Sequence, residues 1–274
     1  GDQGCSGTSC VAACDSAGDN KSTFGCDYYV VGPDILFDGA GACFAAFVVN
    51  TWSTPVSLSV EYEGQPLDAT KFAYLPSGSG GSITYKPLQN GQIPPGEVAI
   101  LFLNRFGFNP LGLVTDCPAG VTPAITTKDT APHGTTRGAA FHITTTAPVV
   151  AYDIYPYGGG QSAFTSATLL LPTSAWDTNY IAVDALGPGF LGGPFVSIVA
   201  QQDGTEVTIN PSADIVGGAN VAATPKGTPG KYSLDRGQVL QFTQPTPLAG
   251  SVIQSTLPVG VWGGKTNLGI DACC

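Results

Sequence analysis

The sequence predicts an all-β protein made of two related antiparallel, sandwich-like repeats preceded by a cysteine-rich N-terminal segment; a propeller-like arrangement is the alternative. Three observations support this class. Only 11% of the residues are charged, while the 274-residue chain holds 37 glycines and 22 prolines, a mixture that suits strands joined by tight turns. Turn signals such as "PSGSGG", "QNGQ" and "QDGTE" separate short apolar runs. No long run has apolar residues at helical spacing.

The strand candidates follow one another at short intervals after the cysteine-rich segment. Each is a short run rich in β-branched, aliphatic or aromatic residues, and a turn-forming residue separates nearly every pair. The predicted strands are 28–31, 45–50, 57–62, 82–85, 97–103, 139–145, 149–155, 167–171, 180–185, 195–201, 206–210, 231–234, 238–242, 251–255 and 259–262.

Three pieces of sequence recur in the same order along the chain. "ITTTAPVVAY", which ends at Tyr152, aligns without gaps with "IQSTLPVGVW", which ends at Trp262. Upstream, "FVVNTWSTPVSLSV" is similar to "FVSIVAQQDGTEVTI", and "PGEVAIL" is similar to "RGQVLQF". Recurrence in a fixed order predicts two copies of one β unit.

The repeat sets the predicted domain boundaries. A disulfide-stapled lead-in occupies residues 1–26, the first repeat occupies 27–176 and the second occupies 177–274. The first repeat is enlarged by a Pro- and Thr-rich insertion at 104–137 that carries Cys117.

The repeat also separates shared from unshared residues in the stretch "ITTTAPVVAYDIYPYGGG". Tyr152 takes the place of Trp262, so both are predicted to be core aromatics. Asp153, Tyr155 and Tyr157 have no equivalents in the second copy. We expect Tyr155 and Tyr157 to be exposed, and these three unshared residues form the predicted binding site. Tyrosine suits such a surface because it offers a large contact area and a hydroxyl group at low entropic cost.

The even number of cysteines predicts disulfides and therefore an oxidising compartment. Their spacing does not match the paired C-x-x-C pattern of zinc sites, and eight cysteines allow about 105 pairings. Adjacent cysteines at the C-terminus are expected to bond to separate partners because of disulfide geometry. The cysteines predicted to be oxidised are Cys5, Cys10, Cys14, Cys26, Cys43, Cys117, Cys273 and Cys274.

Charge and hydropathy exclude two classes of partner. A net charge of −10 with only ten basic residues argues against nucleic acids and anionic membranes, whose binding requires clustered Lys and Arg. The longest apolar runs are far shorter than the roughly 20 residues of a membrane helix. Because the chain begins at Gly1 without Met, we expect a mature or trimmed product that is secreted or displayed at the cell surface.

Catalytic motifs are weak in this sequence. Only His133 and His142 could act as the base of a nucleophilic triad. The segment "GQSAF" matches the G-x-S-x-G motif of the nucleophile elbow only in part. "GPGFLG" matches the G-x-G-x-x-G pattern of dinucleotide-binding sites, but a β-like segment follows it where such a site needs a helix. Carboxylates such as Asp153, Asp184 and Asp203 are interpreted as turn and rim charges. We therefore predict that the protein is not an enzyme.

No cofactor is predicted, although calcium remains an alternative. The segment "DSAGDN" at 15–20, with Asp27 nearby, supplies oxygen ligands in what we expect to be a loop. Its spacing fits no EF-hand loop. Asn20 also opens a sequon for N-glycosylation, "NKS".

Several segments resemble the N-terminal domain of the IgGFc-binding protein family, including bacterial secreted relatives. They are "STFGCDYYVV", "TTTAPVVAYDIYPYGG", "SATLLLPTSAWDTNYIAVDA" and "STLPVGVWGG", and the similarity runs from about residue 25 to the end. The resemblance implies an extracellular, disulfide-bearing, β-rich module. Because the family pattern continues beyond "GIDACC", we expect this chain to be a fragment or a processed form.

Two functions from different classes follow. The first is an extracellular, non-catalytic binding or adhesion module that contacts a protein or glycan through the predicted tyrosine site. The second is a structural subunit that self-associates into a cell-surface layer or filament, for which the sparse charge and stapled ends are the support.

Overall fold

A computed structural model describes residues 3–6, 9–36, 39–107, 114–159, 165–185 and 192–267. The chain divides into two units, and both are discontinuous in sequence. The first comprises Gly1–Val30, Gly41–Asp129 and Phe141–Ala175; the second comprises Val31–Ala40, Thr130–Ala140 and Trp176–Cys274. The predicted domains were continuous ranges, whereas in the structure two short segments of the predicted first repeat join the second unit.

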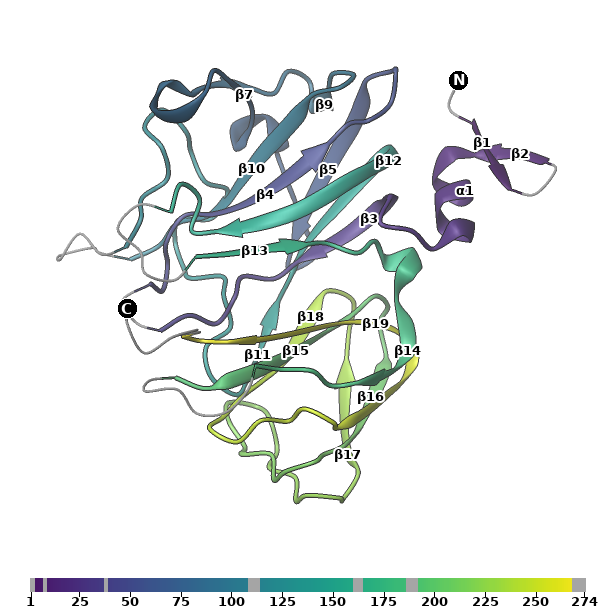
Figure 1. Cartoon of the computed structure of the whole chain (residues 1–274), viewed down its shortest axis with the longest axis vertical. Helices are drawn as coiled ribbons and strands as arrows, with labels where there is room; N and C mark the ends of the chain where they lie inside the picture. Colours follow the sequence, from purple (N-terminus) through teal and green to yellow (C-terminus); the bar gives the residue numbers. More distant parts are fainter. Residues whose placement is uncertain are drawn as a thin grey trace. The chain divides into compact units, whose positions relative to one another are not determined.

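The first unit holds most of the strands (Figure 1). Its elements are β1 Gln3–Ser6, β2 Ser9–Ala12, α1 Ala13–Asn20, β3 Gly25–Val30, β4 Phe44–Val49, β5 Val56–Tyr62, β6 Gln65–Leu67, η1 Ala69–Lys71, β7 Ala73–Ser77, η2 Gly80–Ser82, β8 Thr84–Pro87, β9 Gln92–Ile93, β10 Val98–Asn104, β12 Phe141–Tyr155, β13 Ser166–Leu169 and η3 Thr173–Ala175. The main sheet has the strand order β6-β5-β12-β4-β10-β7-β8, and β3 and β13 also pair with β12.

The second unit contains a separate antiparallel sheet. Its strands are β11 Thr136–Ala139, β14 Asp177–Ile181, β15 Pro194–Ala200, β16 Thr205–Asn210, β17 Gly230–Leu234, β18 Gln238–Thr243 and β19 Val252–Lys265. The order is β11-β18-β15-β19-β16-β17, and β14 pairs with β19. The all-β prediction is confirmed.

The two sheets share an arrangement of six strands. In the first unit β6-β5-β12-β4-β10 are neighbours, and in the second β17-β16-β19-β15-β18 are neighbours, with β3 and β14 as added partners of β12 and β19. Each set occurs in the same order along the chain. This correspondence is what the predicted sequence repeat would produce.

Four predicted strands merge into two long ones. β12 pairs with β5 as far as Thr145 and with β4 from Val150, so Pro148 lies between the two pairings. In β19, Pro258 lies in the same way between the pairing with β16 and that with β15. Proline lacks the N–H of a regular ladder bond and is tolerated where the strand changes partner. The sequence shows each proline as a break, whereas the strand continues through it.

The central strands have near-continuous apolar sequences because both of their faces are covered. Every residue of β15 is buried, as are the residues of β10 after Val98. In the second unit, Ile198, Leu240 and Ile253 belong to one apolar cluster. In the first, Phe47, Ile100 and Phe102 belong to another. Strands with two buried faces lose the polar alternation of half-exposed strands.

The described part of the chain includes the disulfides Cys14–Cys26 and Cys43–Cys117. Cys10 carries an exposed thiol, and the β1–β2 register places it opposite Cys5. Cys273 and Cys274 lie outside the described residues. Among the residues whose side chains the structure describes, Cys14, Cys26, Cys43 and Cys117 are in disulfides, as predicted.

The lead-in contains a helix where the sequence analysis expected a loop. Residues 15–20, "DSAGDN", lie in helix α1 rather than in a loop. The helix ends at Lys21 in the left-handed conformation, with its N–H bonded to the carbonyl oxygen of Gly18. In the described ranges, no group of three or more His, Cys, Asp or Glu side chains is placed to hold a metal ion. None of the described helices is long and apolar enough to cross a membrane.

Candidate binding surface

The predicted binding residues lie at the end of β12, and two of them are buried. Tyr155 is only 3% exposed and Asp153 is also buried, whereas Tyr157 is half-buried. At this point β12 has a neighbour on each side, because Asp153 is opposite Ala46 of β4 and opposite Thr168 of β13. The expectation that Tyr155 is exposed was therefore wrong.

Tyr155 belongs to the interior of the first unit. Its hydroxyl accepts a hydrogen bond of 3.0 Å from the backbone N–H of Ala42, and its ring lies 5.9 Å from the ring of Phe44. Burial is the main cause that raises the pKa of this hydroxyl. Its role is to satisfy a buried donor and to pack, so it is unable to reach a partner.

Asp153 is a carboxylic acid in an apolar setting. Burial is the main cause that raises its pKa to about 7, although hydrogen bonds from Thr168 oppose this shift. A pKa that high makes the protonated and charged forms comparable at neutral pH. Asp153 is therefore a buried titratable group between β4 and β13.

Tyr152 lies on the opposite face of the same strand and is half-buried rather than part of the core. It stands opposite Phe47 of β4 and Leu169 of β13. The rings of Phe47 and Tyr152 are stacked, with centroids 4.6 Å apart and planes at 12°. Leu169 is 53% exposed, so this row of side chains passes from the core to solvent. Trp262 is likewise half-buried, and both predictions of a core aromatic were wrong in this respect.

Tyr157 continues this face beyond the end of β12. Its hydroxyl lies 2.9 Å from the hydroxyl of Tyr85, and its ring lies 5.1 Å from that of Phe102. Its backbone N–H donates a 2.7 Å hydrogen bond to the carbonyl oxygen of Cys43, which is bonded to Cys117. The disulfide thus fixes the backbone that positions Tyr157.

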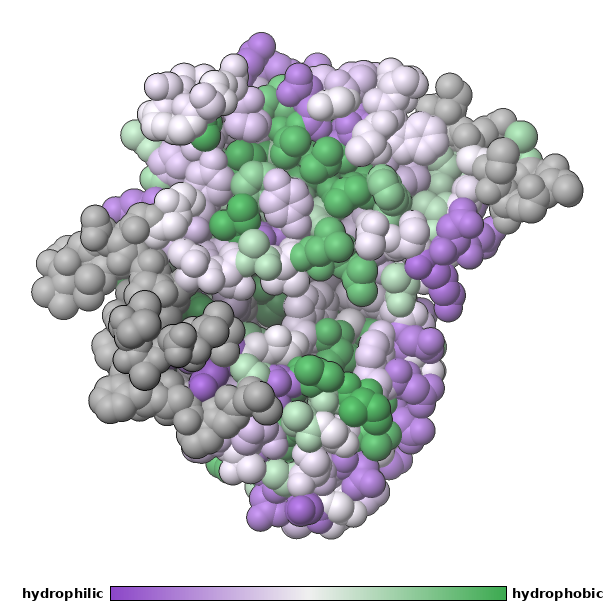
Figure 2. All heavy atoms as spheres, in the orientation of Figure 1, coloured by the Kyte–Doolittle hydropathy of each residue, from purple (hydrophilic) through white to green (hydrophobic). Residues whose placement is uncertain are grey.

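We call Tyr85, Tyr152, Tyr157 and Leu169 the tyrosine surface. Burial is the largest cause that raises the pKa values of Tyr152 and Tyr157, so both hydroxyls stay protonated at neutral pH. Figure 2 shows apolar side chains gathered over β4, β12 and β13. Sequence reasoning found Tyr157 but missed Tyr85 and Leu169, which come next to this face only through strand pairing.

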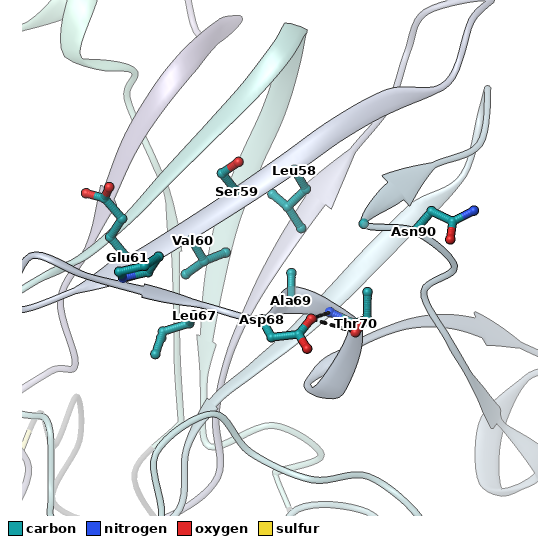
Figure 3. Close-up of a pocket in the computed structure, with 11 residues that line it drawn as sticks. Leu58, Ser59, Val60, Glu61, Leu67, Asp68, Ala69, Thr70 and Asn90 are labelled. Atoms are coloured by element: carbon teal, nitrogen blue, oxygen red, sulfur yellow. Dashed lines mark hydrogen bonds between the residues drawn. The ribbon is translucent and has the colours of Figure 1, made fainter.

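A separate open pocket of about 400 Å³ lies along β5. Figure 3 shows Leu58 and Val60 pointing toward Ala69, whereas Ser59 and Glu61 point the other way. Two acidic residues line the pocket, and contacts within the protein occupy the carboxylates of both. Asp68 accepts hydrogen bonds from Thr70 and begins the short helix η1, and Glu61 lies 3.4 Å from a ring nitrogen of His142.

Both histidines are held by carboxylates. His142 lies between Asp27, at 3.0 Å, and Glu61, and its ring stacks on Tyr29 with centroids 4.5 Å apart. The side chain of His142 is mostly buried. Its contacts with these two acids connect β12 to β3 and to β5.

His133 is held in a different network in the second unit. Its Nδ1 lies 3.0 Å from the buried carboxylate of Asp34. The same carboxylate accepts hydrogen bonds from Gln241 and Thr243, while Gln241 accepts one from Ser197. The segments "GQSAF" at 160–164 and most of "GPGFLG" at 187–192 lie outside the described residues.

Comparison with known proteins gives one family. Residues 166–274 match the family model described as IgGFc binding protein, a segment that begins at β13 and includes β14 to β19. No curated protein and no solved structure matches the chain. The resemblance of this sequence to the IgGFc-binding protein family is therefore confirmed over residues 166–274.

Proposed function

We propose that the protein is an extracellular, non-catalytic binding module and that the tyrosine surface contacts its protein or glycan partner. The observation that carries the proposal is the exposed Leu169 beside the stacked pair Phe47 and Tyr152. Leu169 lies in the segment that matches the binding-protein family. Tyrosine is enriched in contact sites, and an exposed leucine beside a row of aromatic side chains extends the apolar area that a partner can cover.

Rigidity favours a binding role for this surface. The rings of Tyr85, Tyr157 and Phe102 contact one another, and the Cys43–Cys117 disulfide lies next to them. Side chains that are ordered before binding lose little conformational entropy when a partner arrives. The two disulfides also support an extracellular location.

The contacts of the histidines support a non-catalytic reading. His142 is a bridge between Asp27 and Glu61, and His133 is anchored to Asp34. Each of these contacts joins strands or loops that pack against one another, so each has a structural role. We therefore expect that neither His133→Ala nor His142→Ala removes a hydrolytic activity in a panel of ester, peptide and glycoside substrates.

Binding is tested with two probes, an immunoglobulin Fc fragment because of the family description, and an array of glycans. Leu169→Asp should weaken whichever interaction the wild-type protein shows by at least about tenfold, or about 1.4 kcal/mol, because a carboxylate would be desolvated in the contact. Val216→Asp is the matched control, since Val216 is 56% exposed and lies in the second unit. Biolayer interferometry measures both. Equal weakening in the two variants, or no binding of either probe by the wild type, would contradict the proposal.

A buried tyrosine gives a second comparison. Tyr155→Phe leaves the buried N–H of Ala42 without its acceptor, so it should lower stability by about 1–3 kcal/mol. Affinity for the probe should stay unchanged, because Tyr155 does not reach the surface. Thermal melting and interferometry on the same sample measure the two effects. A Tyr155→Phe variant that melts normally but binds weakly would place the contact on the buried face instead.

A further inference from the structure

A second pocket, of about 560 Å³, lies in the first unit beside helix α1. Its lining residues come from β1, from α1 and the segment that follows it, from the loop between β4 and β5, and from Pro148 of β12. Figure 1 shows α1 next to β3 and β12. None of the lining residues belongs to the tyrosine surface, so the pocket is a separate site.

The lining combines aromatic rings, hydroxyl groups and one amide, and none of the described residues that form it is charged. Phe24 is 42% exposed and Trp52 is half-buried. A charged ligand would lose water here without gaining a counter-ion, which is costly. The pocket therefore suits a neutral ligand that offers both an apolar face and hydroxyl groups. The polar side chains of the lining are Ser16, Asn20, Ser22, Thr51 and Ser53.

Both segments that carry an aromatic ring are held in place by the protein itself. The backbone N–H of Trp52 donates a 2.8 Å hydrogen bond to Oδ1 of Asn50, which is fully buried. The amide of Asn50 in turn donates to the carbonyl oxygen of Ile93 at 2.9 Å. On the other side of the pocket, the Cys14–Cys26 disulfide joins α1 to β3 and so fixes the segment between them. A pocket that is ordered before binding costs little conformational entropy when a ligand enters.

The loop that carries Trp52 is longer than its counterpart in the second unit. β4 and β5 are joined by 50–55, "NTWSTP", whereas β15 and β16, which hold the same places in the strand order, are joined by 201–204, "QQDG". The shorter loop closes the same hairpin without an aromatic residue. Trp52 is therefore an addition that the turn between the two strands does not require, and such additions in loops are where binding residues are often found.

We propose that this pocket binds a neutral pyranose sugar, with one face of the sugar ring against the aromatic side chains and its hydroxyl groups bonded to the polar groups of the lining. The C–H groups on the face of a sugar ring carry a slight positive charge, and the face of an aromatic ring is negative. Aromatic and hydroxyl groups therefore meet the two kinds of surface that a sugar presents.

The polar groups that would bond the sugar are open. The indole N–H of Trp52 and the hydroxyl groups of Thr51 and Ser53 have no hydrogen-bond partner among the described residues. Asn20 donates one amide hydrogen to the carbonyl oxygen of Ser16 at 2.8 Å, which leaves its second amide hydrogen and its oxygen for a ligand. Donors and acceptors thus lie side by side, as recognition of hydroxyl groups requires.

Isothermal titration of the whole chain with neutral disaccharides tests the proposal, with cellobiose, lactose, maltose and chitobiose as the probes. At least one should bind with a dissociation constant below about 10 mM, and Trp52→Ala and Phe24→Ala should each raise it by about tenfold or more, because each removes a ring face. Phe106→Ala is the matched control, since Phe106 is 39% exposed in the first unit and does not line the pocket. Absence of binding of all four sugars, or equal weakening by the control, overturns the proposal.

Thermal melting of each variant shows whether a loss of binding is a loss of folding. Phe24 is exposed, so its replacement should leave the melting temperature nearly unchanged and keeps the test valid even where Trp52→Ala unfolds. Trp52→Phe keeps an aromatic face but loses the indole N–H, and its affinity should lie between those of the wild type and Trp52→Ala. A Phe24→Ala variant that melts normally and binds the sugar as the wild type does would contradict the proposal.

A charged sugar and a variant of the tyrosine surface complete the test. The uronic acid form of the disaccharide that binds should have an affinity at least about tenfold lower, because the lining offers no cation and the chain has a net charge of −10. Leu169→Asp should leave sugar binding unchanged. Sugar binding that is lost in Leu169→Asp and kept in Phe24→Ala would overturn the pocket while supporting the proposed function, so the two failures can be told apart.

Discussion

Replacing both Cys43 and Cys117 with alanine is expected to lower the free energy of unfolding by about 4–5 kcal/mol. The two cysteines are 74 residues apart, so the bond removes a large amount of loop freedom from the unfolded chain. Cys117 and Val121 also pack on the aromatic cluster that includes Phe102. Loss of the bond therefore also frees the segment that covers this cluster.

The matched control is the other disulfide. Cys14 and Cys26 are only 12 residues apart, so their replacement should cost about 3 kcal/mol by the same loop-entropy argument. Urea unfolding followed by tyrosine and tryptophan fluorescence gives both values. Equal losses for the two pairs would show that loop closure does not set their contributions. The variant lacking Cys43 and Cys117 should also lose affinity at the tyrosine surface, because Tyr157 is bonded to the backbone of Cys43.

Asp153→Asn is expected to stabilise the protein at pH 8 by up to about 4 kcal/mol and to have little effect near pH 4. Burial raises the pKa of Asp153 from 3.8 in its reference state to about 7 in the folded chain. Between these two values the folded state keeps a proton that the unfolded state has lost. The stability of the wild type therefore falls as pH rises through this window and is level above it, as far as this group is concerned.

Thermal and urea unfolding of the wild type and of Asp153→Asn from pH 4 to pH 8 measure this effect. The difference between their free energies of unfolding cancels the contributions of the titratable groups that both proteins share. Asparagine keeps an oxygen that can accept a hydrogen bond from Thr168, but its side chain does not titrate. Glu97→Gln is the control, because it makes the same kind of substitution at an exposed residue. A constant difference between wild type and Asp153→Asn at every pH would rule out titration of Asp153 in this window.

The positions of most strands were predictable because they depend on local pattern. Runs such as "AILFL" in β10 and "FVSIVA" in β15 gave elements close to their observed bounds. Failures came where a short signal was outweighed by partners far away in sequence. Pro148 and Pro258 appeared as strand ends, but β12 and β19 run through them because each strand exchanges one neighbour for another there.

The binding site was less predictable than the strands. The sequence drew attention to Tyr155 and Tyr157 because they have no equivalents in the second repeat, and the structure buries the first and half-buries the second. Leu169 lies in an ordinary run of leucines, and only its pairing opposite Tyr152 makes it part of a surface. The predicted repeat remains a prediction, with the shared strand order as its support.

The sequence by itself determined the all-β class, the approximate strands, the turns between them and the presence of disulfides. These properties follow from composition and from spacing over a few residues. Only the tertiary structure decided that Cys43 bonds to Cys117 and that Tyr155 lies inside while Tyr152 and Leu169 reach solvent. The physical reason is that burial and pairing depend on which distant strand covers each side of a residue, and alternation along one strand carries no information about that strand's neighbours.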